Sequence, residues 1–262
     1  MNLALVILNS EYKSGYDALS GVKADKERTE KMLSDYTGSD RPFENSIDIG
    51  RDIEIFIDKH KNVKIDRLHF HYSGHGVTNA RLHIEDPTKA ELETGTCSTK
   101  TPVGECLVGV GDGANPHILF SEHDLKSKLL KLKPKSITIT LDCCRDQKRG
   151  APDSQRTSLV LGEKKEISME EEEKIFILNA TLGLHRSNDV DSFTKELYKV
   201  TNQGRKAIKI DKITKKVNDS WKARGIEQRS TEKASKGGGS EWSNYYWPKP
   251  RHENGLRRLI CI

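Results

Sequence analysis

Long apolar runs are absent from this chain of 262 residues, and no stretch approaches the roughly 18 apolar residues that a transmembrane helix needs. We therefore expect no membrane-spanning segment and no membrane partner. Met1 leads directly into the apolar residues 3–8, and polar Asn9-Ser10-Glu11 follow in place of a small-residue cleavage site. This pattern predicts a first β-strand and not a signal peptide.

Cysteine is also scarce, with five residues at positions 97, 106, 143, 144 and 261. An odd number without the spacing of a disulfide framework favours a reducing compartment, so we expect a cytoplasmic protein. Cys97 and Cys106 lie among His83, His117 and His123, but the irregular spacing lacks the pattern of zinc ligands. We predict a loop and no metal there.

No charge of one sign dominates, because 44 basic residues face 39 acidic ones and leave a formal charge of +5. Basic residues gather at 206–224 and 251–258, yet the first segment has helical periodicity with lysines along a solvated face. Nucleic acid is therefore not an expected partner. The glycine-rich run 109–113 matches neither a phosphate-binding loop nor a calcium loop and predicts a turn, so we expect no cofactor.

Strand-like and helix-like segments alternate along the chain, which predicts an α/β fold. The length suits a single domain with one sizeable core, over residues 1–262. Residues 82–119 predict a decorated loop or hairpin with strand-like pieces at 82–84 and 106–110, because Gly, Thr and Pro punctuate them. The other expected elements are strands at 3–9, 68–71, 136–141, 174–180 and 259–262, and helices at 22–36, 46–60, 121–132, from about 191, and 208–223. Ser192 or Asp191 can cap the amide groups of the helix that begins near 191.

Two short motifs each follow an apolar strand: Tyr72-Ser73-Gly74-His75-Gly76 and Asp142-Cys143-Cys144-Arg145. The carboxyl ends of strands in an open α/β sheet meet at one edge, where ligands bind. We therefore expect a histidine and a cysteine to meet there, although they are far apart in the chain. Strand alternation sends adjacent side chains to opposite faces, so only one of the two cysteines can face His75.

The chemistry of such a pair is nucleophilic catalysis. A thiolate is the attacking species, and an imidazole that takes the thiol proton makes cysteine a competent nucleophile. The glycines beside His75 permit a sharp turn, and the backbone N–H groups of Gly76 and Cys144 are candidate oxyanion donors. The alternative is a buried cysteine acting as a small hydrophobic residue and a solvated loop histidine, but the joint occurrence favours catalysis.

At these residues the chain resembles the caspase-like cysteine peptidases, which include caspases, metacaspases and paracaspases. The resemblance implies a three-layer α/β/α sandwich around a mainly parallel sheet, with Cys144 as nucleophile and Cys143 packed beneath the sheet. Caspases proper carry Gln-Ala-Cys at the nucleophile, whereas the acidic form Asp142-Cys143-Cys144 is that of metacaspases and paracaspases.

The same resemblance implies a substrate pocket (S1) for a basic side chain at P1, the residue before the cleaved bond. Asp142 matches one of its acidic positions, and Asp25, in the segment 19–25, matches the other. Two carboxylates can pair with an arginine or lysine in a desolvated pocket. The alternative for Asp25 is a first-turn helix residue that the helix dipole favours. We expect cleavage after Arg or Lys in protein or peptide substrates.

Residues 146–173 have the composition of an exposed linker between a large-subunit-like part, 1–145, and a small-subunit-like part, 174–262. In such a zymogen Arg149, Arg156 and Lys165 are candidate self-cleavage points. The resemblance allows activation by calcium, although no calcium motif is visible, or by formation of a homodimer.

A second hypothesis is a catalytically silent caspase-like domain that serves as a binding or scaffold module. The aromatic group Trp242, Tyr245, Tyr246 and Trp247 is more typical of a terminal segment packed on the core than of a cleft wall.

Overall fold

The computed structural model describes residues 1–13, 16–36, 42–78, 105–111, 119–143, 167–180, 192–202, 208–226, 228, 230–234 and 247. Its strands are β1 (Asn2–Leu8), β2 (Phe43–Glu44), β3 (Arg67–Ser73), β4 (Gly76–Thr78), β5 (Glu105–Val108), β6 (Leu119–Ser121), β7 (Ser136–Asp142), β8 (Ile175–Asn179) and β9 (Thr231–Ala234). Its helices are α1 (Ser20–Met32), α2 (Ile49–His60), α4 (Glu122–Leu130), α5 (Met169–Glu172), α6 (Phe193–Asn202), the 3₁₀ turn η3 (Ile210–Lys212) and α7 (Ile213–Ala223).

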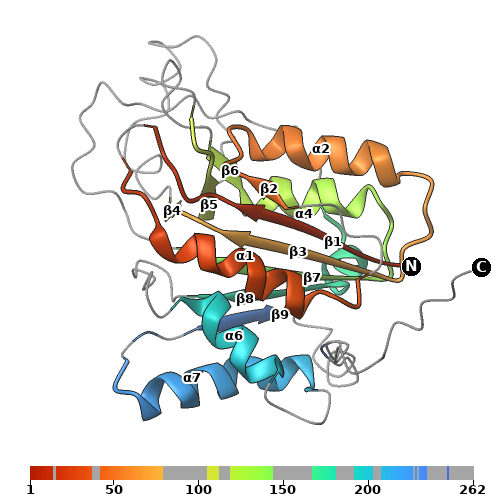
Figure 1. Cartoon of the computed structure of the whole chain (residues 1–262). Helices are drawn as coiled ribbons and strands as arrows, with labels where there is room; N and C mark the ends of the chain where they lie inside the picture. Colours follow the sequence, from red (N-terminus) through yellow and green to blue (C-terminus); the bar gives the residue numbers. More distant parts are fainter. Residues whose placement is uncertain are drawn as a thin grey trace, which may run out of the picture.

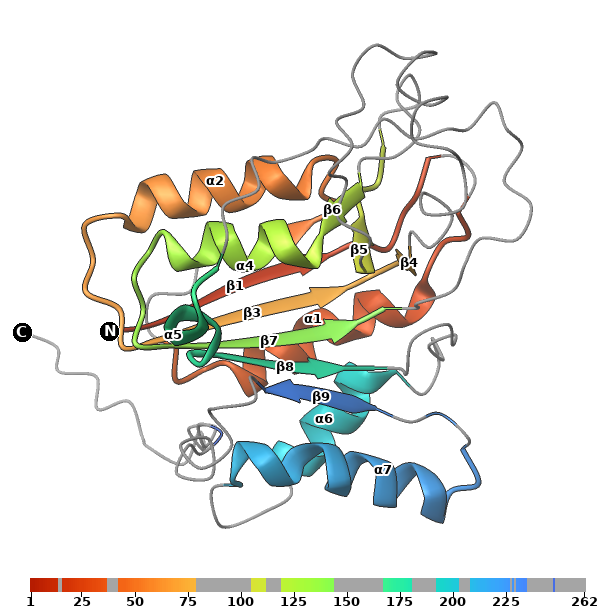
Figure 2. The same cartoon turned by 180° about the vertical axis from the view of Figure 1, so that it is seen from behind.

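A six-stranded sheet in the order β2-β1-β3-β7-β8-β9 forms the centre of the molecule. The first five strands in this order are parallel, and β9 pairs antiparallel with β8, as Figure 2 shows. The alternation of strands and helices therefore produced the mainly parallel α/β sheet that the sequence predicted.

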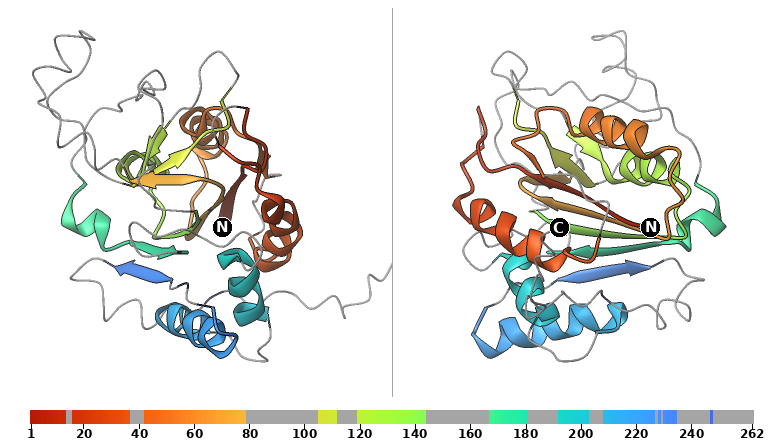
Figure 3. Two further views of the ribbon diagram at one scale, coloured as in Figure 1. Left: turned by 90° about the vertical axis from the view of Figure 1, so that its left-hand side faces the viewer. Right: turned by 45° about the vertical axis from the view of Figure 1, so that its right-hand side comes forward.

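Helices cover both faces of the sheet (Figures 1 and 3). Successive side chains of a strand point to opposite faces, so Leu3, Leu5 and Ile7 of β1 pack in the cluster that includes α2 and α4. Ala4, Val6 and Leu8 pack in the cluster that includes α1, α6 and α7. A parallel strand that is buried on both faces has a continuous run of apolar residues, and this run is why β1 could be predicted from the sequence.

A second, antiparallel sheet has the order β4-β5-β6, and its first strand, β4, begins at the last residue of the histidine motif. β5 pairs with both of its neighbours, so the described part of the expected loop or hairpin is a sheet. Backbone hydrogen bonds of β5 hold β4 in place at the carboxyl end of β3.

The boundaries of several elements differ from the sequence expectations. The helix expected at 208–223 begins as η3 and becomes α-helical at Ile213. The last residues of the expected linker form the short helix α5, which Ser168 and Glu171 cap reciprocally. The strands expected within 82–84 and 259–262 lie outside the described residues. Trp247 is buried against the α6 and α7 side of the core, as expected for the aromatic group.

No helix in the described part of the chain is both long and apolar enough to cross a bilayer.

Candidate active site

The register between β3 and β7 brings the two sequence motifs to the same edge. Ser73 of β3 lies opposite Asp142 of β7, and the Gly74 N–H donates to the Asp142 carbonyl at 3.1 Å. His75 follows Ser73 by two positions, as Cys144 follows Asp142 by two. Cys144 itself lies outside the described residues. Adjacent strands are about 4.8 Å apart, so the register supports the proximity that the sequence predicted for the motifs.

The imidazole of His75 is bound by the loop between β1 and α1. Its Nε2 lies 2.8 Å from the Asp17 carbonyl oxygen, and the rings of Tyr12 and Tyr16 lie with centroids 4.7 and 4.9 Å from it. A carbonyl oxygen can only accept, so Nε2 carries the hydrogen and Nδ1 is the basic nitrogen of the neutral ring. This tautomer suits a general base that acts through Nδ1.

The two peptide groups that flank the His75 side chain also form hydrogen bonds. Its backbone N–H donates to the Tyr12 hydroxyl at 2.8 Å, and its carbonyl accepts from the Tyr72 hydroxyl at 2.7 Å. A Cβ on Gly74 would lie 2.5 Å from the Tyr72 hydroxyl oxygen and 2.7 Å from that of Tyr12. Glycine at position 74 is therefore required by the close approach of both tyrosines to the turn.

The Gly76 amide lies outside the β4–β5 ladder. Gly76 is opposite Leu107, and the bond next to this pair runs from the Val108 N–H to the His75 carbonyl at 3.0 Å. In an antiparallel ladder this makes Gly76 and Leu107 a non-hydrogen-bonded pair, so the Gly76 N–H points away from β5. That orientation is compatible with the oxyanion role expected for it.

Cys143 is 3% exposed and belongs to the core cluster on the α2 and α4 side of the sheet, together with Leu141. This confirms the prediction that Cys143 packs beneath the sheet. A buried thiol in apolar surroundings is a poor nucleophile.

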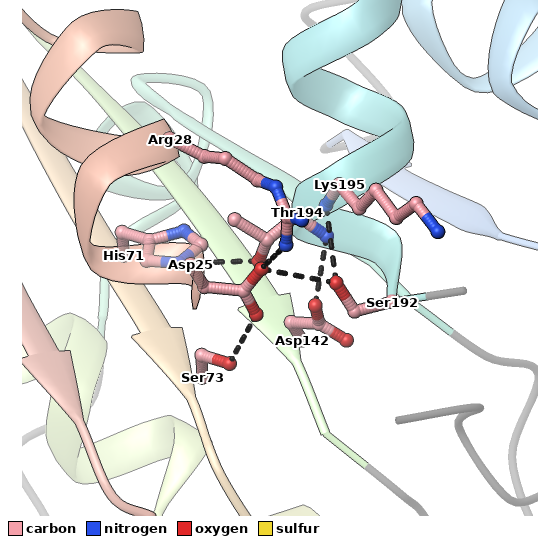
Figure 4. Close-up of polar contacts among 8 residues, drawn as sticks. All are labelled: Asp25, Arg28, His71, Ser73, Asp142, Ser192, Thr194 and Lys195. Carbon is pink, nitrogen blue, oxygen red and sulfur yellow. Dashed lines mark hydrogen bonds and ion pairs between the residues drawn. The ribbon is translucent and has the colours of Figure 1, made fainter. Parts of the chain in front are cut away.

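The structure brings Asp25 and Asp142 together in one buried cluster, although α1 carries one and β7 ends with the other (Figure 4). Asp25 accepts from Ser73 Oγ at 3.1 Å, from Ser192 Oγ at 3.1 Å and from an Arg28 guanidinium nitrogen at 2.8 Å. The Asp142 carboxylate accepts from the Thr194 N–H at 2.7 Å. The start of α6 therefore binds both carboxylates.

Burial and the nearby Asp142 carboxylate raise the pKa of Asp25 to about 7, while Arg28 and Ser192 oppose the rise. Each carboxylate is nearly inaccessible, with Asp25 0% and Asp142 5% exposed. Both carboxylates therefore lie in one desolvated site, with the Arg28 guanidinium bound to Asp25. A desolvated carboxylate is stabilised by pairing with a cation.

Two buried histidines lie behind the cluster. His71 Nε2 lies 3.3 Å from Thr194 Oγ1, and its Nδ1 lies 2.8 Å from Thr140 Oγ1, which is also 3.0 Å from His69 Nε2. Burial lowers the pKa of both histidines, so both remain neutral, and His71 connects Thr140 of β7 to Thr194 of α6.

Sequence reasoning missed several residues of the site because their roles depend on tertiary contacts. Ser192 was expected only as a helix cap, a role it also fulfils, since its Oγ accepts from the Lys195 N–H at 3.1 Å. Arg28 carries a weak signal, because it lies three positions after Asp25 on the same helix face. The others are Tyr12, Tyr16, Ser73 and Thr194.

The described residues contain no group of three or more His, Cys, Asp or Glu arranged to hold a metal ion. The candidate self-cleavage residues Arg149, Arg156 and Lys165 lie outside the described residues.

A mainly parallel sheet that brings a histidine motif and a cysteine-bearing motif to one carboxyl edge is the arrangement that an α/β cysteine peptidase requires. The chain belongs to the caspase domain family, whose sequence profile matches residues 1–237. No curated protein sequence matches the chain. Membership identifies a cysteine peptidase domain in general, with protein or peptide substrates.

Proposed function

We propose that the protein is a cysteine endopeptidase that cleaves after Arg or Lys, with a Cys144–His75 dyad. The observation that carries this proposal is the buried Asp25–Asp142 cluster beside the histidine motif. The acidic form of the motif also favours the metacaspase and paracaspase type over caspases that cleave after Asp.

The reaction uses His75 as the base and then as the acid. Its Nδ1 takes the proton of the Cys144 thiol, and the thiolate sulfur attacks the substrate carbonyl carbon. The carbonyl oxygen becomes an oxyanion, for which the Gly76 and Cys144 N–H groups are the proposed donors. When the C–N bond breaks, the imidazolium returns its proton to the leaving amine. Water then hydrolyses the acyl-enzyme and releases Cys144 as thiol.

The positive charge that forms on His75 is stabilised by the Asp17 carbonyl, which holds Nε2–H in place at 2.8 Å. The Asp17 carbonyl can accept from Nε2–H in both the neutral and the protonated imidazole, so the His75 ring need not rotate during the reaction. Fixed dipoles of this kind require no reorganisation during the reaction.

Specificity for a basic P1 side chain follows from the charge of the cluster. A P1 guanidinium or ammonium would form charge-assisted hydrogen bonds with the paired carboxylates of Asp25 and Asp142. A P1 aspartate would add a third carboxylate to this region and is rejected by like-charge repulsion.

The same specificity makes self-processing at Arg149, Arg156 or Lys165 part of the proposal, since these basic residues follow the nucleophile within the chain. Activation by calcium, which the peptide assay tests directly, and activation by dimerisation are the alternatives to self-processing.

The test compares two matched fluorogenic peptides, one with Arg and one with Asp at P1, with and without calcium. We expect cleavage of the Arg peptide alone, none by Cys144→Ala, and a fall in kcat/KM of about 30-fold or more for Asp142→Asn, because removing one partner of a buried charge pair costs about 2–5 kcal/mol. The matched control is Asp219→Asn, an exposed carboxylate on α7. Cleavage of the Asp peptide, or an unaffected Asp142→Asn variant, would refute the proposed pocket.

A further inference from the structure

Three described residues of the loop between β1 and α1 contact His75. Tyr12 supplies a hydroxyl to the His75 N–H, Tyr12 and Tyr16 place rings against the imidazole, and Asp17 binds Nε2 through its carbonyl. The loop is in turn attached to the segment after β5, because the Lys13 N–H donates to the Val110 carbonyl at 3.3 Å.

The carbonyl group of His75 is bound by Tyr72, a residue of β3. The Tyr72 hydroxyl lies 2.7 Å from the His75 carbonyl oxygen, 2.9 Å from that of Val108 and 3.4 Å from the Tyr12 hydroxyl. The two phenols therefore form one polar unit that binds the peptide groups before and after the histidine. Burial raises the pKa of both Tyr12 and Tyr72, so both hydroxyls stay protonated.

We propose that Tyr12, supported by Tyr72, is a positioning residue that sets the orientation of the His75 imidazole toward the nucleophile. This inference rests on the proposed peptidase function. It assigns Tyr12 no contact with the substrate: the residue acts through His75, by fixing the backbone from which the imidazole extends.

The geometry explains why the hydroxyl and not only the ring matters. His75 is half-buried and its turn contains Gly74, which offers the backbone wide conformational freedom. Without the Tyr12 hydroxyl the His75 N–H loses its acceptor, and the turn can rotate about Gly74 while both rings remain in contact. A displacement of about 1 Å at a reacting group can cost about 100-fold in rate.

The main variant is Tyr12→Phe, which keeps the ring and removes the acceptor, and the matched control is Tyr198→Phe on α6. We expect Tyr12→Phe to lower kcat for the Arg peptide about 10- to 100-fold while KM changes less than about twofold, because the Asp25–Asp142 pocket is unchanged. Tyr198→Phe should match wild type in both constants. Tyr72→Phe should lower kcat in the same manner and serves as the second variant if Tyr12→Phe folds poorly.

Two further readouts separate positioning from a general structural role. The pH profile of Cys144 alkylation by iodoacetamide reports the thiol–imidazole pair without using the substrate pocket, and Tyr12→Phe should shift it and slow the reaction. Nitrogen NMR of the His75 ring should show a single Nε2–H tautomer in wild type and an averaged ring in Tyr12→Phe.

The outcomes distinguish the two proposals. A wild-type protein without peptidase activity refutes the proposed function. The NMR comparison then still tests whether Tyr12 positions the His75 ring. An active wild type with unchanged kcat, alkylation profile and ring signals in Tyr12→Phe overturns the role of Tyr12.

Discussion

Replacing Gly74 by alanine should disrupt the histidine turn, because the added methyl group meets two tyrosines. The added Cβ would lie 2.5 Å from the Tyr72 hydroxyl oxygen, 2.7 Å from its ring carbon Cζ and 2.7 Å from the Tyr12 hydroxyl oxygen. These separations are up to about 1 Å shorter than an ordinary contact of ~3.5 Å. Because Tyr72 is fully buried, its ring cannot move aside into solvent.

The expected cost combines two effects. Overpacking a rigid site costs about 1–3 kcal/mol. Separating the two hydroxyls from the His75 peptide groups removes two hydrogen bonds, at about 1 kcal/mol each. The free energy of unfolding should therefore fall by about 3–5 kcal/mol, and kcat should fall with it, because the turn carries the catalytic base.

Urea unfolding gives the stability change, and cleavage of the Arg peptide at a temperature where the variant remains folded gives kcat. The matched control is Gly50→Ala in α2, where the added Cβ meets the Phe120 ring at 3.1 Å and the gain in helix propensity offsets the contact. If Gly74→Ala proves as stable and as active as Gly50→Ala, then the tyrosine contacts do not constrain the turn and the reasoning is refuted.

Three further predictions concern burial and charge. Glu196 is 1% exposed and accepts from the Arg224 guanidinium and the Ser220 hydroxyl. Glu196→Gln should therefore lower the free energy of unfolding by about 3 kcal/mol in urea titrations. A loss no larger than that of exposed Asp219→Asn would contradict this. The pKa of Asp25 is raised from 3.8 to about 7, so the folded state binds more protons in this range and stability should fall as pH rises from about 4 to 7. Asp25→Asn should remove that slope, which approaches ~1.4 kcal/mol per pH unit for one proton, and an unchanged slope in unfolding measured across this range would count against the shift. Cys143→Ser should lower stability by about 1–3 kcal/mol, because a hydroxyl replaces a core thiol, yet retain peptidase activity; inactivation as complete as that of Cys144→Ala would reverse the roles of the two cysteines.

The parts of the fold predicted from the sequence are those with strong local signals. β1, β3, β7 and β8 are apolar runs buried on both faces, and α2 repeats isoleucine at helical spacing. β9 was missed because Thr231–Ala234 has no apolar pattern and becomes a strand only by pairing with β8. β2, with two residues, is too short to predict.

The candidate site divides in the same way. His75 could be found because it follows a strand, and strand ends meet by topology. Asp142 ends strand β7, but its place in the substrate pocket came from the family resemblance. Asp25 was found only through the family resemblance, since locally it is one acidic residue on a charged helix. Ser192 and Tyr12 could not be assigned, because the atoms they contact lie far from them in the chain.

Covalent labelling with a peptidyl-arginine electrophile near pH 7, followed by peptide mapping, tests the nucleophile and the specificity together. We expect one adduct, on Cys144, that forms far more slowly in the His75→Ala variant and with an electrophile carrying aspartate. An adduct on Cys143, equal labelling by both electrophiles, or no selective labelling would contradict a Cys144–His75 peptidase specific for basic residues.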